Sequence, residues 1–188
     1  MKEDYEEDEE EYTGAGRQMS NQDFDRLFIN KFNKKSKLYG GVFMKDELED
    51  MKPEENKFYI INLDKVGGGG THWVLISNLN PTNIIYIDSF AVPPADVVVN
   101  FMKRAYKLNR NGSESKHRKT IYYNTITLQA DDSINCGYYI AYFAQQLIKK
   151  RNIVDIISDF NLTNDKLSKW MNETLIEKIK RNCILGII

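Results

Sequence analysis

The sequence has few of the residues on which several protein classes depend. It contains two cysteines, four prolines and two histidines among 188 residues. Two cysteines in a chain of this length do not form a disulfide framework, so we expect a reducing environment. The acidic pair Asp131-Asp132 has no histidine or cysteine near it at metal-ligand spacing. The sequence therefore predicts neither a metal site nor a cofactor.

Long apolar runs and a secretion signal are also missing. No stretch reaches the roughly 18 apolar residues that span a bilayer. The N-terminus is acidic and has neither the basic nor the apolar region of a signal peptide. We therefore expect a protein that is not secreted and does not contact membranes. A composition of 41% hydrophobic and 28% charged residues fits one domain with a sizeable core.

Charge is distributed unevenly along the chain, although the formal net charge is only −1. Residues 1–12 contain eight acids and one base, which leaves 25 bases and 19 acids in the rest. A segment of like charges repels itself and has little to bury. We therefore predict a disordered acidic tail over residues 1–17 and a single domain over residues 18–188.

Basic residues recur in clusters along the predicted domain, including residues 103–110, 116–119 and 178–181. One interpretation is a surface that contacts a polyanion such as DNA. The other is an ordinary solvated surface, where lysines are common. The sequence alone leaves both interpretations open.

Hydrophobic periodicity predicts an α+β fold with a small central, mostly antiparallel sheet flanked by helices. Ser20 is typical of a helix N-cap, and Phe24, Leu27 and Phe28 after it share one helix face. Gly40-Gly41 breaks this pattern, and a short helix or an extended piece follows over residues 42–50. We expect strands at 58–63, 73–79 and 84–90, a β-rich run at 120–128, and helices at 95–108, 136–150 and 164–181. In the last helix we expect an apolar side formed by Leu167, Trp170, Met171 and Leu175.

Four residues occur in an order and in contexts that suit a thiol protease. They lie in the segments GGGGTHW (67–73), IIYIDSF (84–90) and LQADDSINCGYY (128–139). Cys136 is the predicted nucleophile, because the start of a helix stabilises a thiolate. His72 is the predicted base, and Asp88 orients it across an antiparallel strand pair. The Gln129 amide and the Cys136 backbone N–H are the predicted oxyanion donors.

Each of these residues also has a purely structural interpretation. Cys136 would be a small buried residue, His72 a half-buried strand residue and Asp88 a turn cap. Gln129 would then be a surface residue. The other histidine, His117, lies in a basic polar loop, and we interpret it as solvated.

Three residues near the predicted site are candidates for substrate binding. The run Gly67–Gly70 lacks the Lys-Ser/Thr of a phosphate-binding loop, so we interpret it as a mobile loop with Gly70 on the substrate side. Trp73 is either core or a wall beside the imidazole. Gly137 would let the backbone approach a substrate closely.

The segments GGTHW and YIDSF and the spacing Q-x6-CG resemble the adenovirus protease family (adenain), which includes proteases that process ubiquitin-like proteins. Within it, the sequence is most similar to the maturation proteases of virophages and Maverick-type DNA elements. The family order is His, Asp or Glu, Gln, Cys, and it assigns His72, Asp88, Gln129 and Cys136 the same roles. One departure is Ala91, which follows Phe90 where the adenovirus enzyme has a glycine.

The resemblance implies a viral cysteine endopeptidase that cleaves capsid and virion precursors at Gly-rich sites. It would act as a monomer in the virion or in the cytoplasm or nucleus of the host cell. The alternatives are a protease for ubiquitin or a SUMO-type modifier, and an inert virion or DNA-binding component with a protease fold. Residues 12–16 resemble a family cleavage site, which predicts self-cleavage between Ala15 and Gly16. A Gly-rich linker is the other interpretation of that segment.

Overall fold

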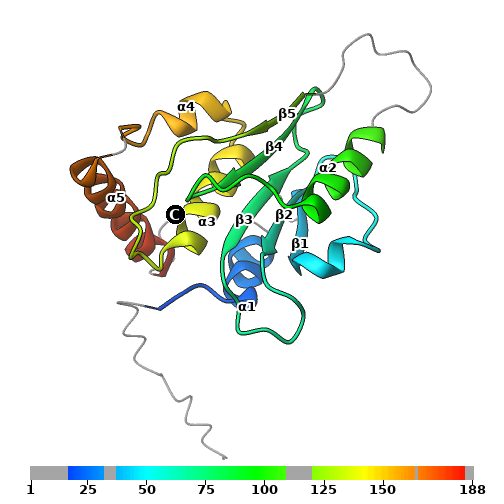
Figure 1. The fold of residues 1–188 in the computed structure, drawn as a ribbon, viewed down its shortest axis with the longest axis horizontal. Coiled ribbons are helices and arrows are strands. Elements are labelled where there is room, and N and C mark those ends of the chain that lie inside the picture. The colour runs from blue at the N-terminus through cyan, green and yellow to red at the C-terminus, as the bar shows by residue number, and fades with distance from the viewer. Residues whose placement is uncertain (1–16, 32–36, 109–119, 164, 185–188) are drawn as a thin grey trace, which may run out of the picture.

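The computed structural model describes residues 17–31, 37–108, 120–163 and 165–184. One five-stranded sheet forms its centre, with helices on both faces (Figure 1), and this confirms the predicted α+β class. The strands lie in chain order across the sheet: β1 (Tyr39–Met44), β2 (Phe58–Asn62), β3 (Trp73–Ser77), β4 (Asn83–Asp88) and β5 (Thr120–Tyr123). The helices are α1 (Asn21–Asp25), which continues as a π-helical segment (Arg26–Lys31), α2 (Asp96–Leu108), α3 (Cys136–Ile148), α4 (Ile153–Ile157) and α5 (Lys166–Ile184).

The core consists of two apolar layers, one on each face of the sheet. Strands β2 and β3 are buried along their whole length, so they read as continuous apolar runs without alternation. On one face Phe58, Leu75 and Ile87 pack with α1, α3 and α5. On the other face Tyr59 and Ile76 pack with α2. The two layers make the sheet a rigid platform for side chains at its ends.

The central strand pairs are antiparallel, as expected, whereas both edge strands pair parallel to their neighbours. Parallel pairing needs a crossover connection. A 3-10 helix (Lys45–Leu48) lies in the connection from β1 to β2, and α2 lies in the connection from β4 to β5. The expectation of a mostly antiparallel sheet therefore describes its centre only.

Strand β1 was not predicted, because Gly40 and Gly41 suggest a break in regular structure. The Tyr59 ring fills the space that a Cβ at Gly40 would occupy. The register shifts between Tyr39 and Gly41, and Gly41 has a φ of 117°. Here the glycines mark a bulged strand on which an aromatic ring packs closely.

The predicted apolar side of α5 is wrong except at Leu175, which is half-buried and packs against the core. Leu167, Trp170 and Met171 have exposed fractions of 65%, 64% and 46%. The buried residues of the helix include polar Asn172 as well as Ile176. Asn172 is buried because its Nδ2 donates to the backbone carbonyls of residues 128 and 161, which lie against this helix. Among the described residues, no helix is long and apolar enough to cross a membrane.

Candidate active site

His72 and Asp88 come together at one end of the central strand pair. Val74 and Asp88 are partners in the antiparallel register of β3 and β4, so His72 lies diagonally across from Asp88. The His72 Nε2 atom is 2.8 Å from Asp88 Oδ1. The exposed fraction of the histidine side chain is 13%, and that of the aspartate side chain is 0%. The sheet itself therefore sets the geometry of this pair.

The buried Asp88 carboxylate has several hydrogen-bond donors around it, as a buried charge requires. Its Oδ1 accepts the backbone N–H of Phe90 at 2.7 Å, and its Oδ2 accepts the Tyr86 hydroxyl at 3.4 Å. Asn124 bonds both the N–H and the carbonyl of Asp88. The Phe90 ring lies 5.0 Å from the His72 ring. Phe90 ends the YIDSF segment that carries the resemblance, whereas nothing in the sequence pattern singled out Asn124.

The Cys136 thiol is close enough to the His72 imidazole to be one of the causes that raise the pKa of His72. Because Asp88 occupies Nε2, the nitrogen available to the thiol is Nδ1. Burial lowers the pKa of His72, but the bonds to Asp88 and Cys136 outweigh burial and raise that pKa to about 9. The imidazole is thus protonated at neutral pH. An imidazolium beside a thiol is the arrangement that supports a thiolate nucleophile.

Cys136 is the first residue of α3, and its surroundings leave one backbone donor free. The Asn135 carbonyl accepts the N–H groups of Tyr138 and Tyr139 and so closes the first turn. Within the described part of the chain, the backbone N–H of Cys136 has no hydrogen-bond partner. A free N–H beside the nucleophile is suited to bind a developing oxyanion.

Gln129 lies in the same loop as Cys136, but the structure shows no bond between them. Its side chain is fully buried. Its Oε1 accepts the Ser89 hydroxyl at 2.6 Å, and its Nε2 donates to the Ser133 carbonyl at 2.7 Å. The amide therefore links the loop after Asp88 to the loop before Cys136. The role of the Gln129 amide as an oxyanion donor stays a prediction.

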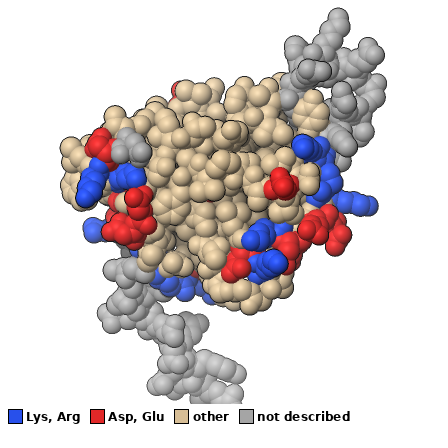
Figure 2. Space-filling view, in the orientation of Figure 1, with Lys and Arg blue, Asp and Glu red and all other residues tan. Residues whose placement is uncertain are grey.

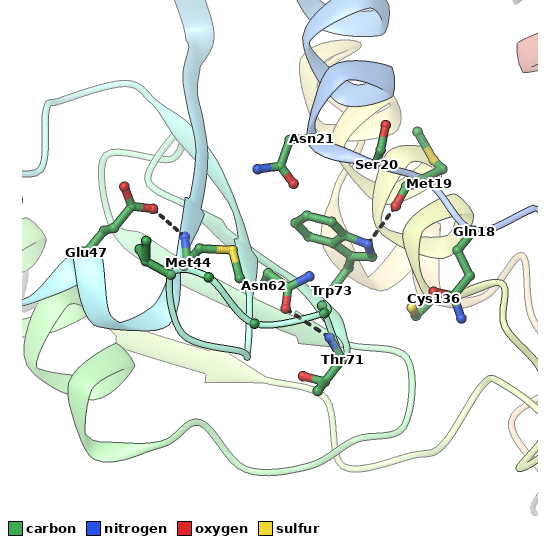
Figure 3. A pocket seen from close by; sticks show the side chains of 15 residues that line it. Gln18, Met19, Ser20, Asn21, Met44, Glu47, Asn62, Thr71, Trp73 and Cys136 are labelled. Carbon is green, nitrogen blue, oxygen red and sulfur yellow. Dashed lines mark hydrogen bonds between the residues drawn. The ribbon is translucent and has the colours of Figure 1, made fainter.

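A cleft of about 590 Å³ opens beside Cys136 (Figure 3). Two predicted substrate-side residues, Gly70 and Trp73, line it. Trp73 is 6% exposed, and its indole N–H donates to the Met19 carbonyl at 3.0 Å. The residues along the cleft come from the N-terminal segment, β1, the end of β2 and the glycine-rich loop: Gln18, Met19, Ser20, Asn21, Met44, Glu47, Asn62, Val66, Gly67, Gly68, Gly69 and Thr71.

Gly137 is not among the residues that line this cleft, and its packing explains its lack of a side chain. A Cβ at Gly137 would lie 2.7 Å from the Met19 Cβ and 3.4 Å from the Phe24 ring. The Tyr138 hydroxyl donates to the Arg17 carbonyl nearby, so the N-terminal segment lies against the start of α3. Arg17, which the sequence places in the tail, also pairs with Asp23.

The glycine-rich loop is hydrogen-bonded at both ends, whereas the sequence suggested a mobile loop. The Val66 N–H donates to Asp46, and the Gly70 N–H donates to Asp64 at 3.1 Å. Asn62 accepts the Thr71 N–H at 3.2 Å just before His72. The Asp64 carboxylate occupies the space that a side chain at residue 68 would need. Asn62 was missed because a strand-end asparagine carries no distinctive signal.

Some residues named in the sequence analysis lie outside the candidate site or outside the described residues. Ala15, Gly16 and His117 lie outside the described residues. Asp131 is exposed and pairs with Lys169 at 2.9 Å. Among the described residues, no group of three His, Cys, Asp or Glu side chains is placed to hold a metal ion.

Comparison with protein families decides the class of this site. The model of the Ulp1 protease family, C-terminal catalytic domain, matches residues 18–179. The chain belongs to this family. It is therefore a cysteine-type peptidase, and the inert alternative loses its support. The match also confirms the adenain-like fold expected from the sequence. A comparison with curated protein sequences finds no match.

Solved structures resemble this Ulp1-family peptidase in fold. The pS273R protease of ASFV aligns with a TM-score of 0.56 and 15% identity over 82% of this chain and 66% of that chain. ChlaDub1 from Chlamydia trachomatis aligns with a TM-score of 0.60 and 11% identity over 91% of this chain and 93% of that chain. The peptidase thus spans slightly less than two thirds of the ASFV protease. Identities this low establish the shared fold alone.

Proposed function

We propose that Cys136, His72 and Asp88 are the catalytic nucleophile, base and orienting carboxylate of this peptidase. The observation that supports this most is the imidazole between a buried carboxylate and a thiol, with the pKa of His72 raised to about 9. A base that is protonated at neutral pH can give its proton to the leaving nitrogen. The free N–H of Cys136 supports an oxyanion site beside the thiol.

In the proposed reaction, the Cys136 thiolate attacks the scissile carbonyl carbon and its electrons move onto the carbonyl oxygen. The Cys136 N–H and the Gln129 amide stabilise that oxygen in the tetrahedral intermediate. Protonated His72 then gives its proton to the leaving nitrogen as the C–N bond breaks, which leaves an acyl-enzyme. Neutral His72 takes a proton from water, and the hydroxide releases the acyl group as a carboxylic acid.

We infer that the substrates are capsid and other virion precursor proteins cleaved at Gly-rich sites during maturation. The cleft beside Cys136 supports recognition of an extended peptide with small residues, since its wall is a glycine run that presents backbone and no side chains. The enzyme would act as a monomer in the virion or in the cytoplasm or nucleus of the infected cell. The resemblance to viral maturation proteases supports this setting.

A protease for ubiquitin or a SUMO-type modifier is the second candidate, because the matching family model carries the name of Ulp1. Both candidates share the proposed mechanism and differ in the protein that presents the glycines. The deciding experiment compares cleavage of short Gly-Ala and Gly-Gly peptide amides with cleavage of intact modifier fusions. Efficient cleavage of short peptides supports the viral endopeptidase. Cleavage that requires a folded modifier supports the alternative.

Self-cleavage between Ala15 and Gly16 is a proposal that concerns residues outside the described range. Two described neighbours support it, since the Arg17 carbonyl bonds Tyr138 and Gln18 lines the cleft with Cys136. N-terminal mass spectrometry should find a new start at Gly16. The Cys136→Ala control should keep Met1, and an intact Met1 in active enzyme contradicts the proposal.

Contact with DNA through a basic surface is a separate part of the proposed function. On the face shown in Figure 2, Lys and Arg lie beside Asp and Glu near the rim, and the middle of the face carries little charge. DNA contact predicts activity that rises with added DNA and falls with salt. Activity that changes with neither added DNA nor salt would contradict DNA contact.

A further inference from the structure

One carboxylate on α5 accepts several hydrogen bonds from the loop between β5 and α3. Glu173 accepts four hydrogen bonds from this loop and from the first turns of α3. Its Oε1 accepts the Ala130 N–H at 3.0 Å and the Tyr139 hydroxyl at 3.1 Å. Its Oε2 accepts the Ser133 hydroxyl at 2.8 Å and the Asn135 Nδ2 at 2.9 Å. The carboxylate therefore adds four bonds from α5 to a segment whose residues also bond one another, as Ser133 N–H does to the Ala130 carbonyl.

The positions of these four donors relate Glu173 to the predicted oxyanion donors. Ala130 directly follows Gln129, and Asn135 directly precedes Cys136. Glu173 thus bonds the Ala130 backbone next to Gln129 and the Asn135 side chain next to Cys136. The Ser133 hydroxyl, bound to Glu173, in turn accepts the Asn135 N–H at 3.2 Å. The distance between the two oxyanion donors depends on this segment.

Asn135 shows how strongly this arrangement depends on α5. Its Nδ2 donates to Glu173 and also to Glu177 at 3.0 Å. Its buried Oδ1 has no hydrogen-bond partner among the described residues. The two carboxylates are therefore the described partners that orient this side chain, whose carbonyl closes the first turn of α3. Movement of Asn135 would turn the neighbouring Cys136 N–H.

Charge makes these bonds stronger than neutral ones would be. A carboxylate that accepts several N–H and O–H groups forms charge-assisted bonds of roughly twice the neutral strength. Burial and the Glu173 carboxylate raise the pKa of Tyr139, so its hydroxyl remains a donor throughout the working pH range. Lys180 lies 3.5 Å from Glu177, which offsets the negative charge of the two acids.

We propose that Glu173 is a positioning residue that sets the oxyanion donors of this peptidase. The proposal rests on the proposed function of Cys136 and His72. Glu173 is not among the residues that line the cleft beside Cys136, and it acts through Ala130 and Asn135. It should therefore affect steps that develop an oxyanion and should leave the thiol–imidazole pair unchanged, since the sheet positions His72.

Two thiol reagents separate these steps. Iodoacetamide alkylates a thiolate at a saturated carbon, so its rate at Cys136 reports the pair with His72 and develops no oxyanion. A peptide aldehyde ending in Gly-Gly adds the thiol to a carbonyl, and its affinity reports the oxyanion site. Glu173→Gln removes the charge and replaces an acceptor with a donor. Lys169→Gln is the matched control, because it removes the exposed ion pair with Asp131 between the same helix and the same loop.

In Glu173→Gln, the alkylation rate should stay within about twofold of wild type, while aldehyde affinity falls by about tenfold to a hundredfold. The control should change both by less than about twofold. Unchanged aldehyde affinity in Glu173→Gln, or an equal fall in both reactions, would overturn the positioning role. Wild-type alkylation no faster than that of His72→Ala would instead contradict the proposed function.

A second variant keeps the proposal open to test if Glu173→Gln does not fold. Ser133→Ala removes one of the four donors and keeps the carboxylate. It should lower aldehyde affinity by about threefold to tenfold, with alkylation unchanged. Equal effects on the two reactions, or no effect on aldehyde affinity, would contradict the role of Glu173.

Discussion

The two halves of the candidate site are held by opposite means. His72 and Asp88 lie at the ends of two antiparallel strands. The register of these strands brings His72 Nε2 to 2.8 Å from Asp88 Oδ1. Gln129 and Cys136 belong to a loop and a helix start that polar side chains of α5 hold in place. Apolar packing of the sheet therefore positions the predicted base. Hydrogen bonds from α5 support the loop next to the predicted oxyanion donors, while Cys136 itself lies in the apolar core at the start of α3. Substitutions in each half should show how strongly turnover depends on that half.

The largest effects should come from one residue of each half, and they should be equal. Cys136→Ala removes the nucleophile and His72→Ala removes the base, so each should lower turnover of a Gly-Gly peptide amide by about 10⁴-fold or more. Both variants should keep the wild-type circular dichroism and thermal midpoint. A His72→Ala enzyme with a tenth of wild-type turnover would show that the sheet half is not needed.

Asp88→Asn should lower turnover by about 10²–10⁴-fold and leave activity that is measurable, because this residue orients the base without transferring a proton. An amide oxygen still accepts the Phe90 N–H, so the turn should survive. Steady-state rates with the same substrate test this. Complete loss of turnover, equal to that of His72→Ala, would contradict an orienting role.

The pH dependence of Asp88→Asn sharpens the same point. The pKa of His72 is raised to about 9, so wild-type activity should fall as pH rises through that value. In Asp88→Asn this alkaline limb should move to lower pH, because a cause of the raised pKa is gone. The stability from the raised pKa is fully present below about pH 6.5 and is lost as pH passes about 9. If the alkaline limb of the pH–activity profile lies at the same pH in both enzymes, Asp88 is not a cause of the raised pKa of His72.

In the loop half, Gln129→Ala should lower turnover by about 10²–10³-fold, as for removal of one oxyanion donor. The variant also leaves the Ser89 hydroxyl and the Ser133 carbonyl without their partner. It should therefore lose about 1–3 kcal/mol of stability, which urea unfolding measures. A fully active Gln129→Ala enzyme would show that Gln129 stabilises the structure but is not an oxyanion donor.

The smallest effect should come from Ala91 in the turn after Asp88. This residue has a φ of 57°, a conformation that favours glycine, and the adenovirus enzyme has a glycine at the matching place. Ala91→Gly should raise the free energy of unfolding by about 1 kcal/mol and change turnover by less than about twofold. A destabilised Ala91→Gly variant would show that the turn carries no such strain.

The sheet half could be predicted from the sequence because its determinants are local. The apolar runs of β3 and β4 and the short turn between them predict an antiparallel pair with His72 near Asp88. The bulged strand β1 was not predictable, because Gly40 indicates a break until the Tyr59 ring is seen against it. Its parallel pairing depends on a crossover that no local pattern encodes.

The loop half depends on contacts between residues far apart in the chain. Ala130 and Glu173 are 43 residues apart, and periodicity along α5 gives no sign that its polar face points inward. The exposed Trp170 and buried Asn172 reverse the usual preference, since unpaired loop N–H and carbonyl groups need polar partners. The order of the four residues was visible in the sequence, but the support of the loop between Gln129 and Cys136 by α5 was not.

The most direct test of the account is the rate at which iodoacetamide labels Cys136, read by peptide mapping with Cys183 as the internal reference. We predict that Cys136 reacts much faster than Cys183 in the wild-type protein. This difference in labelling rate should be lost in His72→Ala and kept in Lys169→Gln. Equal rates at Cys136 and Cys183 in the wild-type protein would contradict an activated thiol–imidazole pair.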